Sequence, residues 1–129
     1  MGKMVLVVDD DSDIVTFVVA VLEENGYTSL IAQNGEVGMS KAIEEKPDLI
    51  ILDILMPKES GIKMYSKLKG DELLKKIPVI ILSGIARRTF LRSQEALTGP
   101  GNQSVPEPEA YLEKPVEPEE LVEVIRKFI

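Results

Sequence analysis

The 129-residue chain has the length of a single domain and carries a formal net charge of −7. This acidic balance argues against nonspecific nucleic-acid binding, since phosphate contacts need a basic face. The chain contains no cysteine and no histidine, which excludes disulfides, thiolate metal sites and histidine bases. Any chemistry must therefore use carboxylates, hydroxyls, lysine or the backbone.

No apolar stretch of the sequence has a length suited to crossing a membrane, which takes roughly 20 residues. The amino terminus also lacks the hydrophobic core of a secretory signal. We therefore expect a cytoplasmic protein without a membrane partner.

Apolar runs of strand length alternate along the chain with amphipathic stretches of helix length. Strands are predicted over residues 4–8, 27–32, 49–52, 78–82 and 110–113. A helix is predicted after each strand. The first is opened by residues 9–13, one of whose carboxylates is the expected N-cap, and it ends at Asn25-Gly26, with Gly26 suited to the left-handed position after the helix. The other helices are predicted over residues 36–45, 62–70, 87–96 and 118–128. Three of the strands are continuously apolar, which is typical of strands buried on both faces at the centre of a parallel sheet. The pattern predicts an α/β fold of the flavodoxin-like (βα)5 type, a three-layer sandwich with a five-stranded parallel sheet in the order 2-1-3-4-5.

Asp53 directly follows the apolar run 49–52, and Pro57 shows that the strand has ended shortly after it. The residue is therefore expected at the carboxyl edge of a central strand, where open α/β sheets bind their ligands. The alternative is that Asp53 only caps the following turn, as aspartate often does. Taken alone, the residue does not decide between the two interpretations.

Other polar residues follow the other predicted strands. Asp9 and Asp10 come after the first strand, Ser83 after the fourth and Lys114 after the fifth. Parallel neighbours lie about 4.8 Å apart, so these side chains are expected to share one cleft with Asp53. Two carboxylates about 4 Å apart repel by roughly 4 kcal/mol at an effective dielectric near 20, so a cation must share the site. Lys114 supplies one charge, and oxygen-only ligation favours Mg²⁺.

Four motifs resemble those of the CheY-like receiver domains of two-component response regulators. They are Val-Val-Asp-Asp-Asp at 7–11, Leu-Asp-Ile-Leu-Met-Pro at 52–57 with a later Gly61, Leu-Ser-Gly at 82–84 and Tyr-Leu-Glu-Lys-Pro at 111–115. No single motif is decisive, but four in the right order, each at a strand end, make a chance match improbable. The resemblance covers essentially the whole chain and implies a single receiver domain over residues 1–129.

The resemblance assigns a role to each matching residue. Asp53 would be the nucleophile that takes a phosphoryl group from the phosphohistidine of a sensor histidine kinase, from a histidine phosphotransfer protein or from a small phosphodonor. Asp9, Asp10 and Asp53 would hold Mg²⁺ together with the main-chain carbonyl of Leu55. Mg²⁺ and Lys114 would offset the charge of the phosphoryl group.

The resemblance also implies a switch. Ser83 would swing to hydrogen-bond a phosphoryl oxygen, and Tyr111 would follow it inward, changing the face formed by the fourth helix, fifth strand and last helix. The alternatives are that Ser83 caps the next helix and that Tyr111 only packs. A cis bond before Pro115 is expected in the family. The protein would be a signalling phosphoacceptor, not an enzyme, and would act on a downstream protein target or on an output domain outside this chain, without direct nucleic-acid binding.

Two features depart from a typical receiver domain. Positions 84 to 113 form a longer segment than expected, and the surplus lies in a Gly/Pro-rich loop at about 97–109, which predicts a shortened, displaced or disordered fourth helix. The residues two beyond Asp53 and two beyond Ser83 are apolar, namely Leu55 and Ile85. Such side chains cannot orient an attacking water, so we expect a slowly hydrolysed acyl phosphate.

Three other classes of protein are alternatives to this interpretation. A haloacid-dehalogenase-type phosphatase has an Asp-x-Asp motif after its first strand, which Asp9 and Asp11 fit. That family also needs acidic metal ligands at the end of a later strand, after the lysine, and it would leave Asp53 without a role. A dinucleotide-binding domain needs a glycine-rich turn after the first strand, and none is present. A degenerate receiver that acts only as an interaction module remains an alternative, although every position for the chemistry is intact.

Overall fold

The computed structural model describes residues 2–56, 61–98 and 106–129. Within these ranges, five strands and five helices alternate along the chain. The strands are β1 (Met4–Val8), β2 (Thr28–Ala32), β3 (Leu49–Leu52), β4 (Val79–Ser83) and β5 (Ala110–Glu113). The helices are α1 (Ser12–Glu24), α2 (Gly35–Glu45), α3 (Gly61–Gly70), α4 (Arg87–Thr98) and α5 (Pro118–Arg126).

The strands form one parallel sheet in the order β2-β1-β3-β4-β5, which confirms the predicted fold class. Its register brings the strand ends level, because Val8 pairs with Leu52, Leu52 with Ile81, and Ile81 with Tyr111. The residues that follow these positions therefore emerge at the same edge of the sheet.

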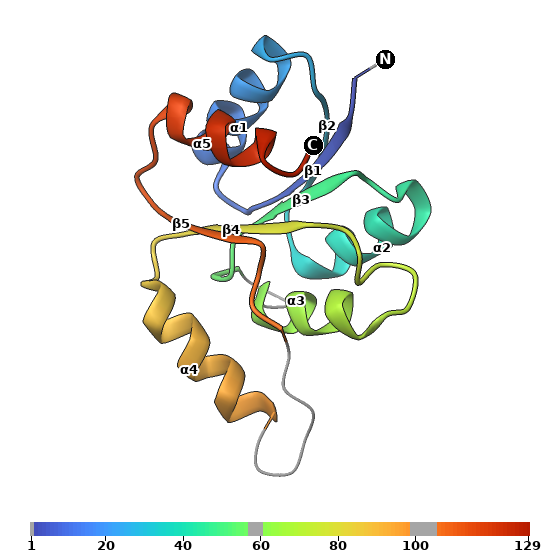
Figure 1. Ribbon diagram of the computed structural model, residues 1–129, viewed down its shortest axis with the longest axis vertical. Coiled ribbons are helices and arrows are strands. Elements are labelled where there is room, and N and C mark those ends of the chain that lie inside the picture. Colours follow the sequence, from blue (N-terminus) through green and yellow to red (C-terminus); the bar gives the residue numbers. More distant parts are fainter. Residues whose placement is uncertain (1, 57–60, 99–105) are drawn as a thin grey trace.

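Helices cover both faces of the sheet, with α1 and α5 on one face and α2, α3 and α4 on the other (Figure 1). Strand β3 shows how alternation along a strand fills both layers. Leu49 and Ile51 pack in the α1/α5 core, whereas Ile50 and Leu52 pack in the core on the opposite face. All four side chains are buried, as the continuous apolar run predicts for a central strand.

Both ends of α1 are capped by residues whose side chain or backbone suits that position. The side chain of Asp11 accepts hydrogen bonds from the backbone amides of Asp13 and Ile14, at 2.9 and 3.3 Å. Asn25 is the C-cap, and Gly26 beyond it has φ +83°, a conformation that glycine adopts without steric cost. Because Asp11 is the N-cap of α1, the carboxylates of Asp9 and Asp10 are not needed to cap this helix.

The structure corrects the prediction for the fourth helix. Helix α4 is 12 residues long and continues to Thr98, so it is not shortened, and residues 97 and 98 of the predicted loop belong to the helix. Nothing in the sequence breaks the helix before Gly99 and Pro100. Residues 99–105, which make up most of the predicted loop, and residues 57–60 before α3 lie outside the described residues. In the described part of the chain, no helix is long and apolar enough to span a membrane.

Candidate functional site

Asp9 and Asp53 lie side by side because each continues the strand before it by one residue. The backbone amide of Asp53 donates to the carbonyl of Val8 at 2.9 Å, and that of Asp9 donates to the carbonyl of Ala32 at 3.0 Å. Only 2% of the surface of Asp9 and 5% of that of Asp53 is exposed. The sheet thus holds two carboxylates in largely buried positions at its carboxyl edge.

Asp10 completes an acidic cluster at this edge. One carboxylate oxygen from each of Asp9, Asp10 and Asp53 lies within 4.8 Å of the others. Asp10 is exposed, so the cluster opens to solvent on its side. An oxygen-only set of this kind suits a hard divalent cation such as Mg²⁺, which keeps several of its waters.

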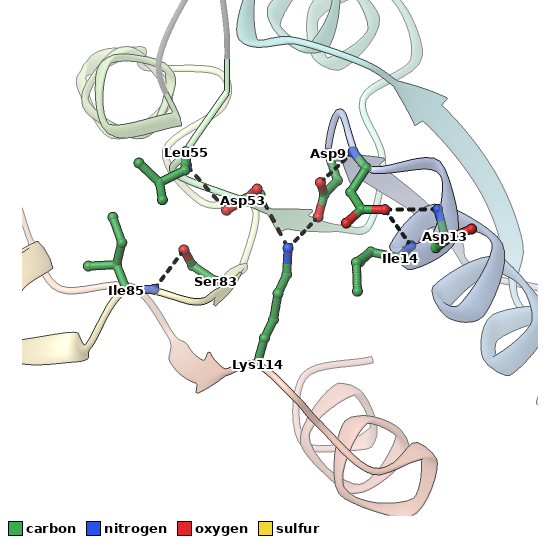
Figure 2. Close-up of polar contacts among 9 residues, drawn as sticks. Asp9, Asp13, Ile14, Asp53, Leu55, Ser83, Ile85 and Lys114 are labelled. Atoms are coloured by element: carbon green, nitrogen blue, oxygen red, sulfur yellow. Dashed lines mark hydrogen bonds and ion pairs between the residues drawn. The ribbon is translucent and has the colours of Figure 1, made fainter.

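Lys114 reaches into the cluster from the end of β5 (Figure 2). Its Nζ lies 3.1 Å from Oδ2 of Asp9 and 3.6 Å from Oδ2 of Asp53. The backbone amide of Lys114 donates to the carbonyl of Ser83 at 2.8 Å, which fixes the base of the side chain against β4. The bond between Lys114 and Pro115 is cis, as expected.

The pKa of the Asp9 carboxyl is raised above its ordinary value, mainly because burial disfavours the charged form. The backbone amide of Asp11, at 2.9 Å, and the ammonium of Lys114 oppose this rise, whereas the charge of Asp53 adds to it. Two buried carboxylates share the one ammonium of Lys114 here, and this arrangement fits a place for a divalent cation.

Leu55 lies beside Asp53 in the turn after β3. Its backbone amide donates to Oδ1 of Asp53 at 3.2 Å, while its side chain is 59% exposed. Figure 2 shows the side chains of Leu55 and Ile85 on the same side of the site as Ser83. Neither of the two apolar side chains carries a group that could hydrogen-bond a water beside Asp53.

Gly61 packs directly against the backbone of this turn. A Cβ atom at Gly61 would lie 2.0 Å from the carbonyl oxygen of Asp53 and 2.5 Å from Cα of Ile54, closer than real contacts allow. Both clashing atoms belong to the backbone, so they cannot move aside without shifting Asp53.

We expect the substitution Gly61→Ala to lower the free energy of unfolding by about 1–3 kcal/mol, the usual cost of overpacking. Chemical denaturation measures this loss. The matched control is Gly70→Ala at the end of α3, where an added Cβ meets nothing within 4 Å. Equal stability of the two variants would contradict the steric requirement at Gly61.

Ser83 is fully buried at the end of β4, and its Oγ accepts a hydrogen bond from the backbone amide of Ile85 at 3.3 Å. This bond closes a local turn before α4, which begins only at Arg87. No hydrogen bond between Ser83 and Asp53 is found among the described residues.

Tyr111 points from β5 toward the same turn. Its hydroxyl donates to the carbonyl of Ile85 at 2.6 Å. Burial raises the pKa of Tyr111 to about 12, and the carboxylates of Glu113 and Asp53 add to the rise. Its ring also packs on Phe90 of α4, with ring centroids 5.5 Å apart. Phe90 is not among the site residues that the motifs indicate, and its sequence signal is that it is the one aromatic residue of the basic helix α4, where it is buried.

Comparison with known proteins agrees with this geometry. Residues 5–126 match the response regulator receiver domain family. The chain is 30% identical to the polar-differentiation response regulator DivK of Brucella anthropi over 129 residues, which cover 100% of this chain and 98% of DivK. It is 35% identical to the phosphate regulon transcriptional regulatory protein PhoB of Pseudomonas aeruginosa over 95% of this chain and 49% of PhoB. The chain spans about half or less of the length of the transcriptional regulators that it matches.

The fold also agrees with that of solved response regulator structures. The chemotaxis response regulator CheY4 of Vibrio cholerae superposes with a TM-score of 0.82 and 25% sequence identity, and the match covers both chains completely. The order of strands, the acidic cluster and the family match lead to one conclusion. The chain belongs to the response regulator receiver domain family, and its acidic pocket is consistent with a phosphoacceptor and a Mg²⁺ site.

Proposed function

We propose that Asp53 is the phosphoacceptor of this receiver domain. The observation that carries the proposal is the position of the Lys114 ammonium, 3.6 Å from Asp53 and 3.1 Å from Asp9, beside the acidic cluster. A phosphoryl group on Asp53 would enter a site that already holds one cation and suits a second. Phosphoryl transfer depends mostly on such positioning and charge stabilisation.

Asp9, Asp10, Asp53 and the main-chain carbonyl of Leu55 would hold Mg²⁺, whose charge would stabilise the transferred group. An oxygen of Asp53 would form the new P–O bond while the P–N bond of a donor phosphohistidine breaks. Lys114 would then turn from the carboxylates to the phosphoryl oxygens.

Ser83 and Tyr111 would report the modification. The Oγ of Ser83 now accepts from Ile85, and it would instead donate to a phosphoryl oxygen. Because Tyr111 is bound to the carbonyl of the same Ile85, a change at Ser83 would alter the support of its ring.

The phosphoryl donor would be a sensor histidine kinase or a histidine phosphotransfer protein. The domain over residues 1–129 would act as a signalling phosphoacceptor that assists its own phosphorylation and dephosphorylation but transforms no other substrate. Its target would be a downstream protein or an output domain of a longer chain, and it would not bind nucleic acid directly.

The test is incubation with acetyl phosphate and Mg²⁺, followed by intact-mass measurement. The wild type is expected to gain one phosphoryl group, and Asp53→Ala is expected to gain none. Asp13→Ala is the matched control, because Asp13 is an exposed carboxylate in the first turn of α1. A wild type that takes up no phosphate, or an adduct that survives Asp53→Ala, would instead support a degenerate receiver.

Apolar groups beside Asp53 give a further expectation. Leu55 and Ile85 offer no hydrogen bond to an attacking water, so the acyl phosphate is expected to be hydrolysed slowly, with a lifetime well beyond seconds. Leu55→Asn supplies a polar group at an exposed position and is expected to shorten that lifetime. Decay of the phosphorylated mass in Mg²⁺ measures both. Leu73→Asn is the control, since Leu73 is 75% exposed and follows α3. A wild-type lifetime of seconds would refute the expectation.

A further inference from the structure

A row of three aromatic rings leads away from the candidate switch. Phe90 lies between two tyrosines, with its ring centroid 5.5 Å from that of Tyr111 and 5.6 Å from that of Tyr65. The Tyr65 pair is edge-to-face, and both Phe90 and Tyr65 are fully buried. In a close-packed interior, a ring in this position cannot move without its neighbours. Phe90 is therefore in contact with both Tyr111 and Tyr65.

Tyr65 ends this row at the segment that leads into β5. Its hydroxyl donates to the main-chain carbonyl of Pro106, a bond that satisfies a buried hydroxyl. Residues 106–109 run beside α3 before the chain enters β5 (Figure 1). We call these four residues the pre-β5 segment.

Glu109 fixes the same segment at a second point. Its carboxylate oxygens lie 3.0 and 3.2 Å from Nζ of Lys69, whose side chain is only 4% exposed. Oε1 of Glu109 also accepts from the backbone amide of Val79, the first residue of β4, at 2.7 Å. Lys69 itself lies 5.9 Å from the centroid of the Tyr65 ring. Both anchors of the segment are therefore next to Tyr65, one through its hydroxyl and the other through Lys69 beside its ring.

We propose that the pre-β5 segment is a second conformational readout of phosphorylation, coupled to Ser83 through Tyr111, Phe90 and Tyr65. The proposal rests on the proposed function, in which Ser83 leaves Ile85 for the phosphoryl group. Tyr111 then loses its fixed partner, and the three rings shift. As a result, the hydrogen bond from Tyr65 to Pro106 weakens, and so do the bonds that Glu109 makes with Lys69 and Val79. The coupling is reciprocal, so a partner that holds the segment in place shifts the equilibrium at Ser83 as well.

Fluorine NMR of protein containing 3-fluorotyrosine tests the proposal, because the chain has three tyrosines that can be assigned by single Tyr→Phe substitutions. Tyr27 packs in the α1/α5 core and serves as the internal control. With acetyl phosphate and Mg²⁺, the signals of Tyr111 and Tyr65 are expected to shift while that of Tyr27 stays. In Phe90→Leu, which keeps an apolar side chain but removes the ring, only the Tyr111 signal is expected to shift.

Hydrogen exchange at the Val79 amide gives a second readout of the Glu109 anchor and is expected to become several-fold faster on phosphorylation. Intact mass on the same sample confirms uptake. A phosphorylated wild type in which Tyr111 shifts, while Tyr65 and the Val79 amide do not change, would overturn this inference and leave the proposed function standing.

A chain that takes up no phosphate would contradict the proposed function, and the coupling is then tested without it. Tyr111→Phe removes only the hydroxyl that holds Ile85. In unphosphorylated protein this variant is expected to shift the Tyr65 signal and to speed exchange at Val79, and both effects should vanish in a Phe90→Leu background. Absence of both effects in Tyr111→Phe alone would refute the coupling.

Discussion

Replacing Lys114 by methionine is expected to slow phosphoryl uptake on Asp53 by on the order of 100-fold, the usual effect of removing one group that stabilises transition-state charge. Methionine keeps an unbranched stem but removes the ammonium that lies 3.1 Å from Asp9 and 3.6 Å from Asp53. The increase in phosphorylated mass with time, in acetyl phosphate and Mg²⁺, measures the rate.

The same substitution is expected to destabilise the metal-free domain, because two buried carboxylates lose their counter-charge. We expect a loss of about 1–3 kcal/mol, which is less than for a fully buried pair because the Lys114 side chain is 20% exposed. Denaturant unfolding in a chelator measures it. Lys127→Met is the matched control, since that lysine is the exposed C-cap of α5 and makes no contact with Asp9 or Asp53 among the interactions of the described residues. An unchanged uptake rate in Lys114→Met would show that the ammonium does not act on the phosphoryl group.

The sequence predicts the sheet and the acidic site because both depend on local patterns that repeat at every strand. Continuous apolar runs such as 49–52 mark central strands, and parallel pairing then forces the residues after them to one edge. Asp9, Asp53 and Lys114 meet for this reason, and no long-range information is needed beyond the order of the strands.

The pre-β5 segment shows where such reasoning ends. Tyr65 bonds to Pro106 across 41 positions, and Lys69 bonds to Glu109 across 40. These contacts depend on how the chain returns from α4 to β5, and no period or spacing in the sequence encodes that path. The Gly/Pro-rich composition predicts a loop over this stretch, and residues 106–109 lie outside any helix or strand, but the composition does not predict that they are anchored on α3.

Replacing Asp9 by asparagine is expected to change stability in opposite directions with and without metal. In a chelator the variant should be more stable than the wild type by about 1 kcal/mol, because it removes a buried charge that raises the electrostatic cost of folding. Asparagine has the same size, its oxygen can still accept from the amide of Asp11, and Lys114 keeps Asp53 as a partner.

The pH dependence of the metal-free protein follows from the raised pKa of Asp9. Between the ordinary aspartate pKa and the raised value, the folded state binds more protons than the unfolded state. The wild type therefore loses stability as the pH rises through this interval and regains it as the pH falls. Asp9→Asn lacks this contribution, so its advantage should be largest near neutral pH and shrink in acid.

Mg²⁺ is expected to reverse the order of the two proteins. At a free Mg²⁺ concentration about 100 times Kd, binding adds about 2.7 kcal/mol to the stability of the wild type. Asp9→Asn loses one charged ligand of the cluster and should gain little at the same concentration. Denaturant unfolding with and without Mg²⁺ measures both gains, and Asp13→Asn, which leaves the cluster intact, should behave as the wild type. An equal gain in Asp9→Asn would place the metal away from Asp9. A wild type that gains nothing would mean that Lys114 alone supplies the positive charge at Asp53.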